Sequence, residues 1–209
     1  MKAYPTPVGS SELSDSRLID RFIPRSDHGG LHEAMVRAPA DLVFDVAWNL
    51  DLRAHPAVRA IFWLREKLLG GTPGPASQLK GLVPETMSLG WGVLAHRPGR
   101  ELVVGAVTQP WQANVVFRAL PAQEFAAFAA PDFVKIVWTL EAEPIGPALT
   151  RFRTETRALP TDEDARRKFD RYWRFAGIGI HLIRVLTLPA VRRQSERRYV
   201  RQSGRAKAD

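Results

Sequence analysis

The stretch RFRTETRALPTDEDARRKFDRYWRFAGIGIHLIR, residues 151–184, runs from a strand pattern straight into a helix pattern. Residues 151–158 alternate between two sets. The set expected on a dry face is Phe152, Thr154, Thr156 and Ala158, and the set expected on a solvated face is Arg151, Arg153, Glu155 and Arg157. Alternation with a period of two predicts a strand in a sheet that is covered on one side only. The charged set should form exposed ion pairs worth about 0–1 kcal/mol each.

The remainder of the stretch predicts the helix that covers the sheet. Pro160, Thr161 and Asp162 with the acids that follow form a typical helix start. Apolar residues then recur at helical spacing as far as Leu186. Two glycines, Gly177 and Gly179, interrupt this helix, although each costs about 0.5–1 kcal/mol relative to alanine. A kink, a close backbone contact and a space left for a ligand each explain them, and the sequence does not separate these explanations.

The preceding residues predict a strand, two helices and a run of further strands. Residues 30–38 alternate, with His32, Ala34, Val36 and Ala38 on one face. Helical spacing follows over 39–49 and 57–69, and GGTPGPAS ends the second helix. Strand patterns then cover 85–96, 101–108, 111–120 and 133–143, the first two being joined by a tight turn at 97–100. Because no helix separates these strands, we expect antiparallel pairing and an α+β fold.

Composition limits the classes of protein that fit. The 209 residues contain no cysteine, which excludes disulfides and thiol chemistry and suits a reducing cytoplasm. No apolar run is long enough for a transmembrane segment. Most of the net charge of +8 lies after Thr161. We expect a flexible N-terminal arm (1–29), one domain (30–191) and a basic tail (192–209), which is either a solvated helix end or a contact for an anionic surface or partner.

One motif resembles a known superfamily. Val36-Arg37-Ala38-Pro39-Ala40-Asp41-Leu42-Val43-Phe44 is similar to the apolar-x-Ala-Pro-x-x-x-Val-Phe entry motif of START-like proteins, the polyketide cyclase/dehydrase and lipid-transport (SRPBCC) superfamily. Residues 101–105, 154–157, 172–173 and 182–184 extend the likeness to uncharacterised bacterial members, over about 31–198. The resemblance implies a helix-grip fold, in which a curved antiparallel sheet wraps around a long C-terminal helix and encloses an apolar cavity.

The candidate site residues are those expected to line that cavity. Metal-ligand spacing, a phosphate-binding loop and a nucleophile motif are all missing from the sequence, so we expect no metal and no cofactor. The polar candidates are His32, Glu101, Tyr172 and His181, each of which is also a plausible structural polar group. The remaining candidates are Trp91, Trp111, Trp138, Phe152, Trp173, Gly177 and Ile180.

These observations predict that the chain binds a hydrophobic small molecule, such as a lipid, a polyketide-like compound or an isoprenoid. A cyclase or dehydratase that uses polar groups in the cavity is the alternative in the enzyme class. An interaction module acting through the basic tail is a third possibility.

Overall fold

The computed structural model describes residues 17–51 and 81–205, with residues 175–176 and 178–184 described by their backbone alone. The helix expected at 57–69, residues 1–16 of the expected arm, and the side chains of Ile180 and His181 lie outside the described residues.

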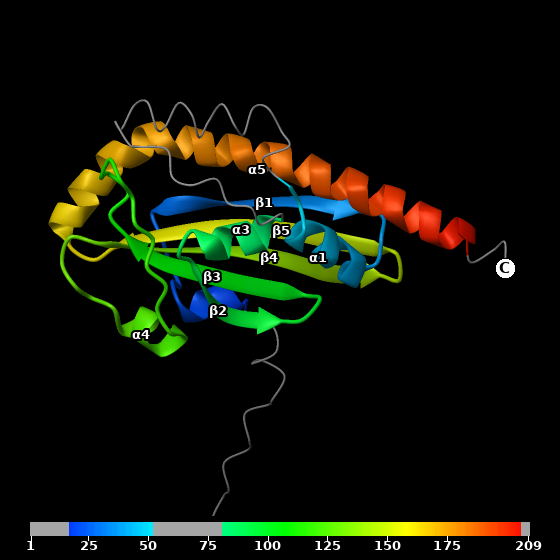
Figure 1. The fold of residues 1–209 in the computed structure, drawn as a ribbon, viewed down its shortest axis with the longest axis horizontal. Helices are drawn as coiled ribbons and strands as arrows, with labels where there is room; N and C mark the ends of the chain where they lie inside the picture. The colour runs from blue at the N-terminus through cyan, green and yellow to red at the C-terminus, as the bar shows by residue number, and fades with distance from the viewer. Residues whose placement is uncertain (1–16, 52–80, 206–209) are drawn as a thin grey trace, which may run out of the picture.

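One antiparallel sheet organises the described chain, with strand order β1-β5-β4-β3-β2 (Figure 1). Its strands are β1 (His28–Val36), β2 (Gly92–Arg97), β3 (Glu101–Thr108), β4 (Val134–Gly146) and β5 (Leu149–Pro160). The helices are η1 (Leu18–Arg21), α1 (Ala40–Trp48), α3 (Leu82–Ser88), α4 (Ala122–Ala127) and α5 (Glu163–Arg205). The α+β class and the helix-grip order predicted from the sequence are confirmed.

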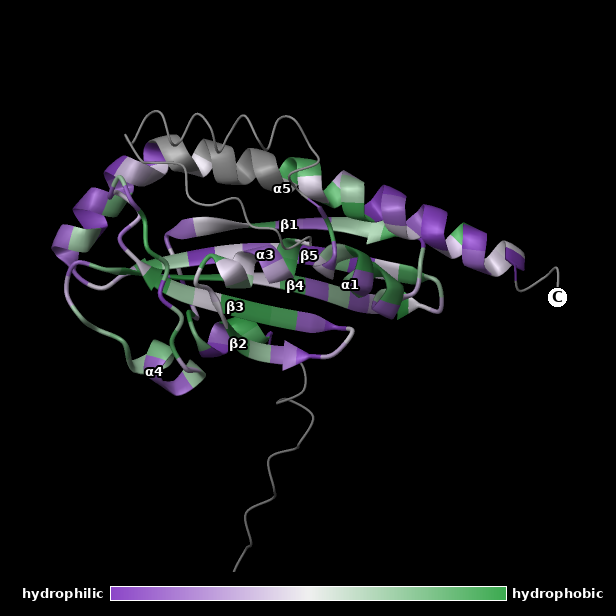
Figure 2. Ribbon diagram, viewed as in Figure 1, coloured by the Kyte–Doolittle hydropathy of each residue, from purple (hydrophilic) through white to green (hydrophobic). Residues whose placement is uncertain are grey.

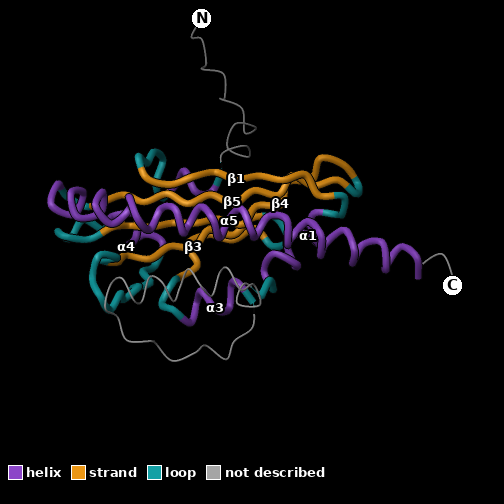
Figure 3. Tube along the Cα trace, turned by 90° about the horizontal axis from the view of Figure 1, so that it is seen from above, coloured by secondary structure: helices purple, strands orange, loops and turns teal. Residues whose placement is uncertain are grey.

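The long helix α5 covers one face of the sheet, which we call the inner face (Figure 3). Its start is capped as expected, since the Asp162 carboxylate accepts the Ala165 backbone N–H at 2.7 Å. One apolar cluster, which we call the α1 cluster, joins α1 and the C-terminal part of α5 to the sheet through Val43, Phe152 and Val191. A second, smaller cluster, which we call the Phe169 cluster, joins the N-terminal part of α5 to the sheet through Val134, Ala158 and Phe169. The helix is therefore held at two separate places.

The opposite, outer face of the sheet is also covered. Ile19 and Ile23 from the N-terminal segment pack there with Phe125 of α4 and with Val103 and Val137 of the sheet. Residues 17–29 were expected to belong to a flexible arm, and this expectation is wrong for them. They form η1, a connection and the start of β1, because Leu18, Ile19 and Ile23 supply an apolar face that the sheet buries.

The basic tail also differs from expectation. Residues 192–205 continue α5 without a break, and Ser195 is fully buried while Tyr199 packs on the α1 cluster. The boundary expected at residue 191 thus falls inside a helix, because apolar contacts continue past the point where the sequence becomes basic.

Two strand expectations are wrong in detail. Residues 82–88 form α3, with Pro84 in the first turn where a missing N–H is tolerated, and the strand begins only at Gly92. Residues 111–120 make a single bridge, from Arg118 to Val107. There the Thr108 hydroxyl donates to the Val116 carbonyl at 2.8 Å and folds the chain back on the end of β3.

Candidate functional site

The middle of the inner face carries small and polar residues between the two apolar clusters. This central patch consists of Gly30, His32, Trp138, Thr154 and Thr156. Gly30 pairs with Thr156 and His32 pairs with Thr154 across β1 and β5, while Trp138 of β4 pairs with Thr156 from the other side. The patch is therefore continuous across three strands.

Burial varies across the central patch. Thr154 and Thr156 are 3% and 5% exposed, whereas His32 and Trp138 are only half-buried. Residues on either side of the patch are larger or more apolar, such as Phe152 toward α1 and Ile136 toward the start of α5. The patch thus combines two nearly buried threonines with a half-buried histidine and a half-buried tryptophan.

A histidine–aspartate pair lies at the end of the inner face where α5 begins. The His28 Nε2 atom is 2.7 Å from the Asp170 Oδ1 atom. The His28 ring also contacts Phe169 and Trp173 edge-on, with centroid distances of 4.9 and 6.0 Å. Its Nδ1 atom is buried and has no hydrogen-bond partner among the residues that the structure describes. When Asp170 accepts the Nε2–H of a neutral ring, Nδ1 is left as a buried acceptor.

His28 was missed by the sequence reasoning. It continues the alternation of His32, Ala34 and Val36 toward the N-terminus, and its facing follows from that alternation. Its pairing with Asp170 could not be found in this way, because the two residues are 142 positions apart.

The structure brings several predicted site residues together and separates others. His32 and Trp138 belong to the central patch, and Tyr172 and Trp173 lie beside it in the Phe169 cluster. Trp111 reaches the same cluster, with the Lys168 ammonium 5.7 Å from its ring. Trp91 packs on Phe117, with a centroid distance of 5.1 Å, and borders the α1 cluster, as Trp138 does. Phe152 is fully buried in the α1 cluster.

Glu101 is on the opposite side of the sheet from the site, so the expectation that it points inward is wrong. Leu102 and Val104 take the inner face of β3, and Glu101 lies with Glu141 on the outer face. Its carboxylate accepts the Leu18 backbone N–H at 2.9 Å and pairs with Arg97 at 3.2 Å. Burial raises the pKa of Glu101 above its ordinary value, partly offset by the hydrogen bond from Leu18.

Gly177 makes a close contact within its own helix. A Cβ atom at this position would lie 3.1 Å from Nε1 and 3.2 Å from Cε2 of the Trp173 indole. Of the explanations for this glycine, the structure supports close contact, and the contacting group is an aromatic ring of α5 itself. The Trp173 indole thus occupies the space that a side chain at position 177 would need.

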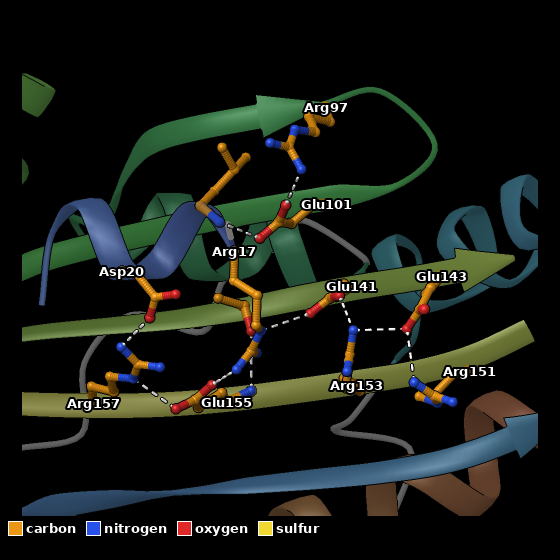
Figure 4. A network of polar contacts seen from close by, with 12 residues as sticks. Arg17, Asp20, Arg97, Glu101, Glu141, Glu143, Arg151, Arg153, Glu155 and Arg157 are labelled. Carbon is orange, nitrogen blue, oxygen red and sulfur yellow. Dashed lines mark hydrogen bonds and ion pairs between the residues drawn. The ribbon is translucent and has the colours of Figure 1, made fainter. Parts of the chain in front are cut away.

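The outer face carries a network of ion pairs that holds the N-terminal segment on the sheet (Figure 4). Arg17 bridges Glu141 and Glu155, and Arg153 pairs with Glu141 and with Glu143, the last at 2.8 Å. The charged set of β5 was expected to form exposed pairs, and this is wrong for all but Arg151. Residues 17–24 cover these side chains and leave those of Arg153, Glu155 and Arg157 largely buried. The network connects elements and lies away from the central patch.

Similar proteins were found by structure and not by sequence. The sequence matches no family model and no curated protein. The fold is similar to a ZhuI aromatase/cyclase from Streptomyces sp. R1128, with 16% identity, a TM-score of 0.32, and 82% of this chain and 94% of that chain covered. A hypothetical protein from Helicobacter pylori matches with 11% identity, a TM-score of 0.43 and coverage of 92% and 99%. At these identities and scores the likeness concerns the fold alone.

Within residues 17–51 and 81–205, none of the helices combines the length and the apolar character that crossing a bilayer requires. Among the same residues, no three His, Cys, Asp or Glu side chains gather as a metal-binding group. The residues described at the site include the His28–Asp170 pair, two threonines and several aromatic rings.

Proposed function

We propose that the chain binds an apolar small molecule between the inner face of the sheet and α5. The observation that supports this most is the composition of the central patch. Gly30 has no side chain, and Thr154 and Thr156 have small ones, at positions of the inner face where a packed core would hold large apolar residues. The helix is anchored on either side of this place by the two inner-face clusters.

The surroundings of the patch suit a largely apolar ligand with a few polar groups. The rings of Trp138 and Trp173 supply flat apolar surface, and both are only partly buried. His32, Thr154 and Thr156 add a few polar groups to this largely apolar surface. Ligand sites are typically built in this way, with apolar walls and a small number of placed polar groups.

Binding can be tested with the apolar fluorescent probe Nile red and two substitutions at one position. Thr156→Leu adds bulk to the central patch and should weaken probe binding at least several-fold, while Thr156→Val removes the hydroxyl at nearly constant volume and should bind as the parent does. Arg151→Leu, on the same strand but on the outer face, is the control for a general effect of leucine on β5. Equal binding by all four proteins would refute the proposed location.

Native mass spectrometry of the purified full-length protein then identifies a natural ligand. A co-purified small molecule that Thr156→Leu lacks and Arg151→Leu retains would support the proposal. A ligand retained by both variants would place the binding site elsewhere.

The His28–Asp170 pair favours a second candidate function, proton transfer on a bound ligand. A carboxylate that fixes one ring nitrogen leaves the other available as an acid or base. The test is to incubate the identified ligand with the parent and with His28→Gln and Asp170→Asn, and to look for a change in its mass or isomeric form. Conversion by the parent alone, with binding kept in all three, would indicate an enzyme. Absence of conversion by the parent would leave a binding protein.

A further inference from the structure

The last turns of α5 carry a line of arginines on one side. Arg193, Arg197, Arg201 and Arg205 recur at every fourth residue, and we call them the arginine stripe. Residues four apart lie on the same side of an α-helix and are separated by about 6 Å along its axis. The stripe therefore presents four guanidinium groups in a row.

The stripe faces away from the body of the protein. Val191 and Ser195, on the opposite side of the helix, are fully buried, and Tyr199 packs against the α1 cluster. All four arginines of the stripe are exposed. The end of α5 runs past the sheet (Figure 1), and most of its turns are coloured as hydrophilic in Figure 2.

Nearby acidic groups are already engaged by arginines outside the stripe. Glu196 lies 3.6 Å from Arg192 and also accepts the Arg37 backbone N–H at 3.1 Å. Asp45 of α1 pairs with Arg198. Within the described ranges no stripe arginine forms an ion pair, and the only hydrogen bond found for the stripe goes from Arg193 to the Pro189 carbonyl at 3.2 Å. The positive charge of the stripe is thus left without a partner in the described protein.

We propose that the arginine stripe binds the phosphate backbone of a nucleic acid. Guanidinium groups bind phosphate oxygens in a bidentate manner, and a row of them suits a partner with phosphates repeated along a line. A helix that lies in a membrane surface needs an apolar side, and here that side is packed on the protein. Val200, 69% exposed, is the one large apolar side chain exposed among the described residues of these turns. The proposal is independent of the small-molecule site.

The test measures binding of the full-length protein to a fluorescently labelled DNA duplex by anisotropy between about 50 and 200 mM salt. Four phosphate contacts predict a slope of log K against log salt of about −3.6. The double variant Arg197→Gln/Arg201→Gln should make the slope shallower by about 1.8. Arg171→Gln/Arg174→Gln is the matched control, since it removes the same charge from exposed positions of the same helix and should leave the slope close to that of the parent.

Three results would overturn the proposal. The first is a lack of salt-dependent binding by the parent at low salt, and the second is an equal change of slope in the two double variants, which would reflect net charge alone. The third is stripe-dependent binding to phosphatidylglycerol vesicles without binding to the duplex, which would identify a lipid surface as the partner. Far-UV circular dichroism of each variant confirms that α5 is retained.

Discussion

Arg157 is the best position for testing whether the outer-face network stabilises the fold. Its Nη1 atom donates to Asp20 Oδ1 at 2.7 Å and to the Ile23 carbonyl at 2.6 Å, and its Nε donates to Glu155 Oε1 at 2.7 Å. Its side chain is only 14% exposed. Arg157→Ala would therefore release the N-terminal segment from β5 and leave polar groups beneath it without partners.

The expected cost follows from which of these groups remain buried. A hydrogen bond to a charged group contributes about 1.5–3 kcal/mol, and removing one partner of a buried pair costs about 3–5 kcal/mol. Both figures must be reduced here, because Asp20 is substantially exposed and Glu155 keeps its contact with Arg17. We expect Arg157→Ala to lower the free energy of unfolding by about 2–3 kcal/mol and the melting temperature by roughly 5–10 °C.

Arg151→Ala is the matched control for this prediction. It removes the same residue type from the same face of β5, but its side chain is 39% exposed and its contact with Glu143 is 3.2 Å long. Its cost should be about 0.5 kcal/mol or less. Urea denaturation followed by circular dichroism gives both values. If the two variants were destabilised equally, the conclusion that the N-terminal segment covers and strengthens this network would be wrong.

Two other predictions concern Glu101 and Gly177. Because burial raises the pKa of Glu101 above 4.5 in the folded protein, the folded state binds more protons than the unfolded state just above that pH. The stability contributed by this group should thus fall as the pH rises through that range. In Glu101→Gln the urea denaturation midpoint should therefore depend less on pH there than in the parent. An unchanged pH dependence would contradict the burial of Glu101. Gly177→Leu should cost about 1–3 kcal/mol despite the better helix propensity of leucine, because it meets the Trp173 indole. The cost should shrink in a Trp173→Ala background, and a cost of the same size there would show that another group is the obstacle.

Features that depend on near neighbours in the chain were determined by the sequence. The alternation in 151–159 set the two faces of β5, and residues 97–100 set the turn between β2 and β3. Asp162 set the start of α5 through a contact with Ala165, three residues away. Side-chain direction in a strand and the capping of a helix arise from local geometry, so a pattern over a few residues is enough to predict them.

What lies on each face was decided only by the tertiary structure. The charged side of β5 looked solvated in the sequence, yet residues 17–24 cover it, and Arg17 reaches Glu155 across 138 positions. The same long-range packing placed Glu101 under η1 and joined His28 to Asp170. The local sequence around a polar side chain is the same whether water or a distant segment of the chain covers that side chain. Its burial, its pKa and its partners therefore depend on which remote segment has enough apolar surface to pack over it.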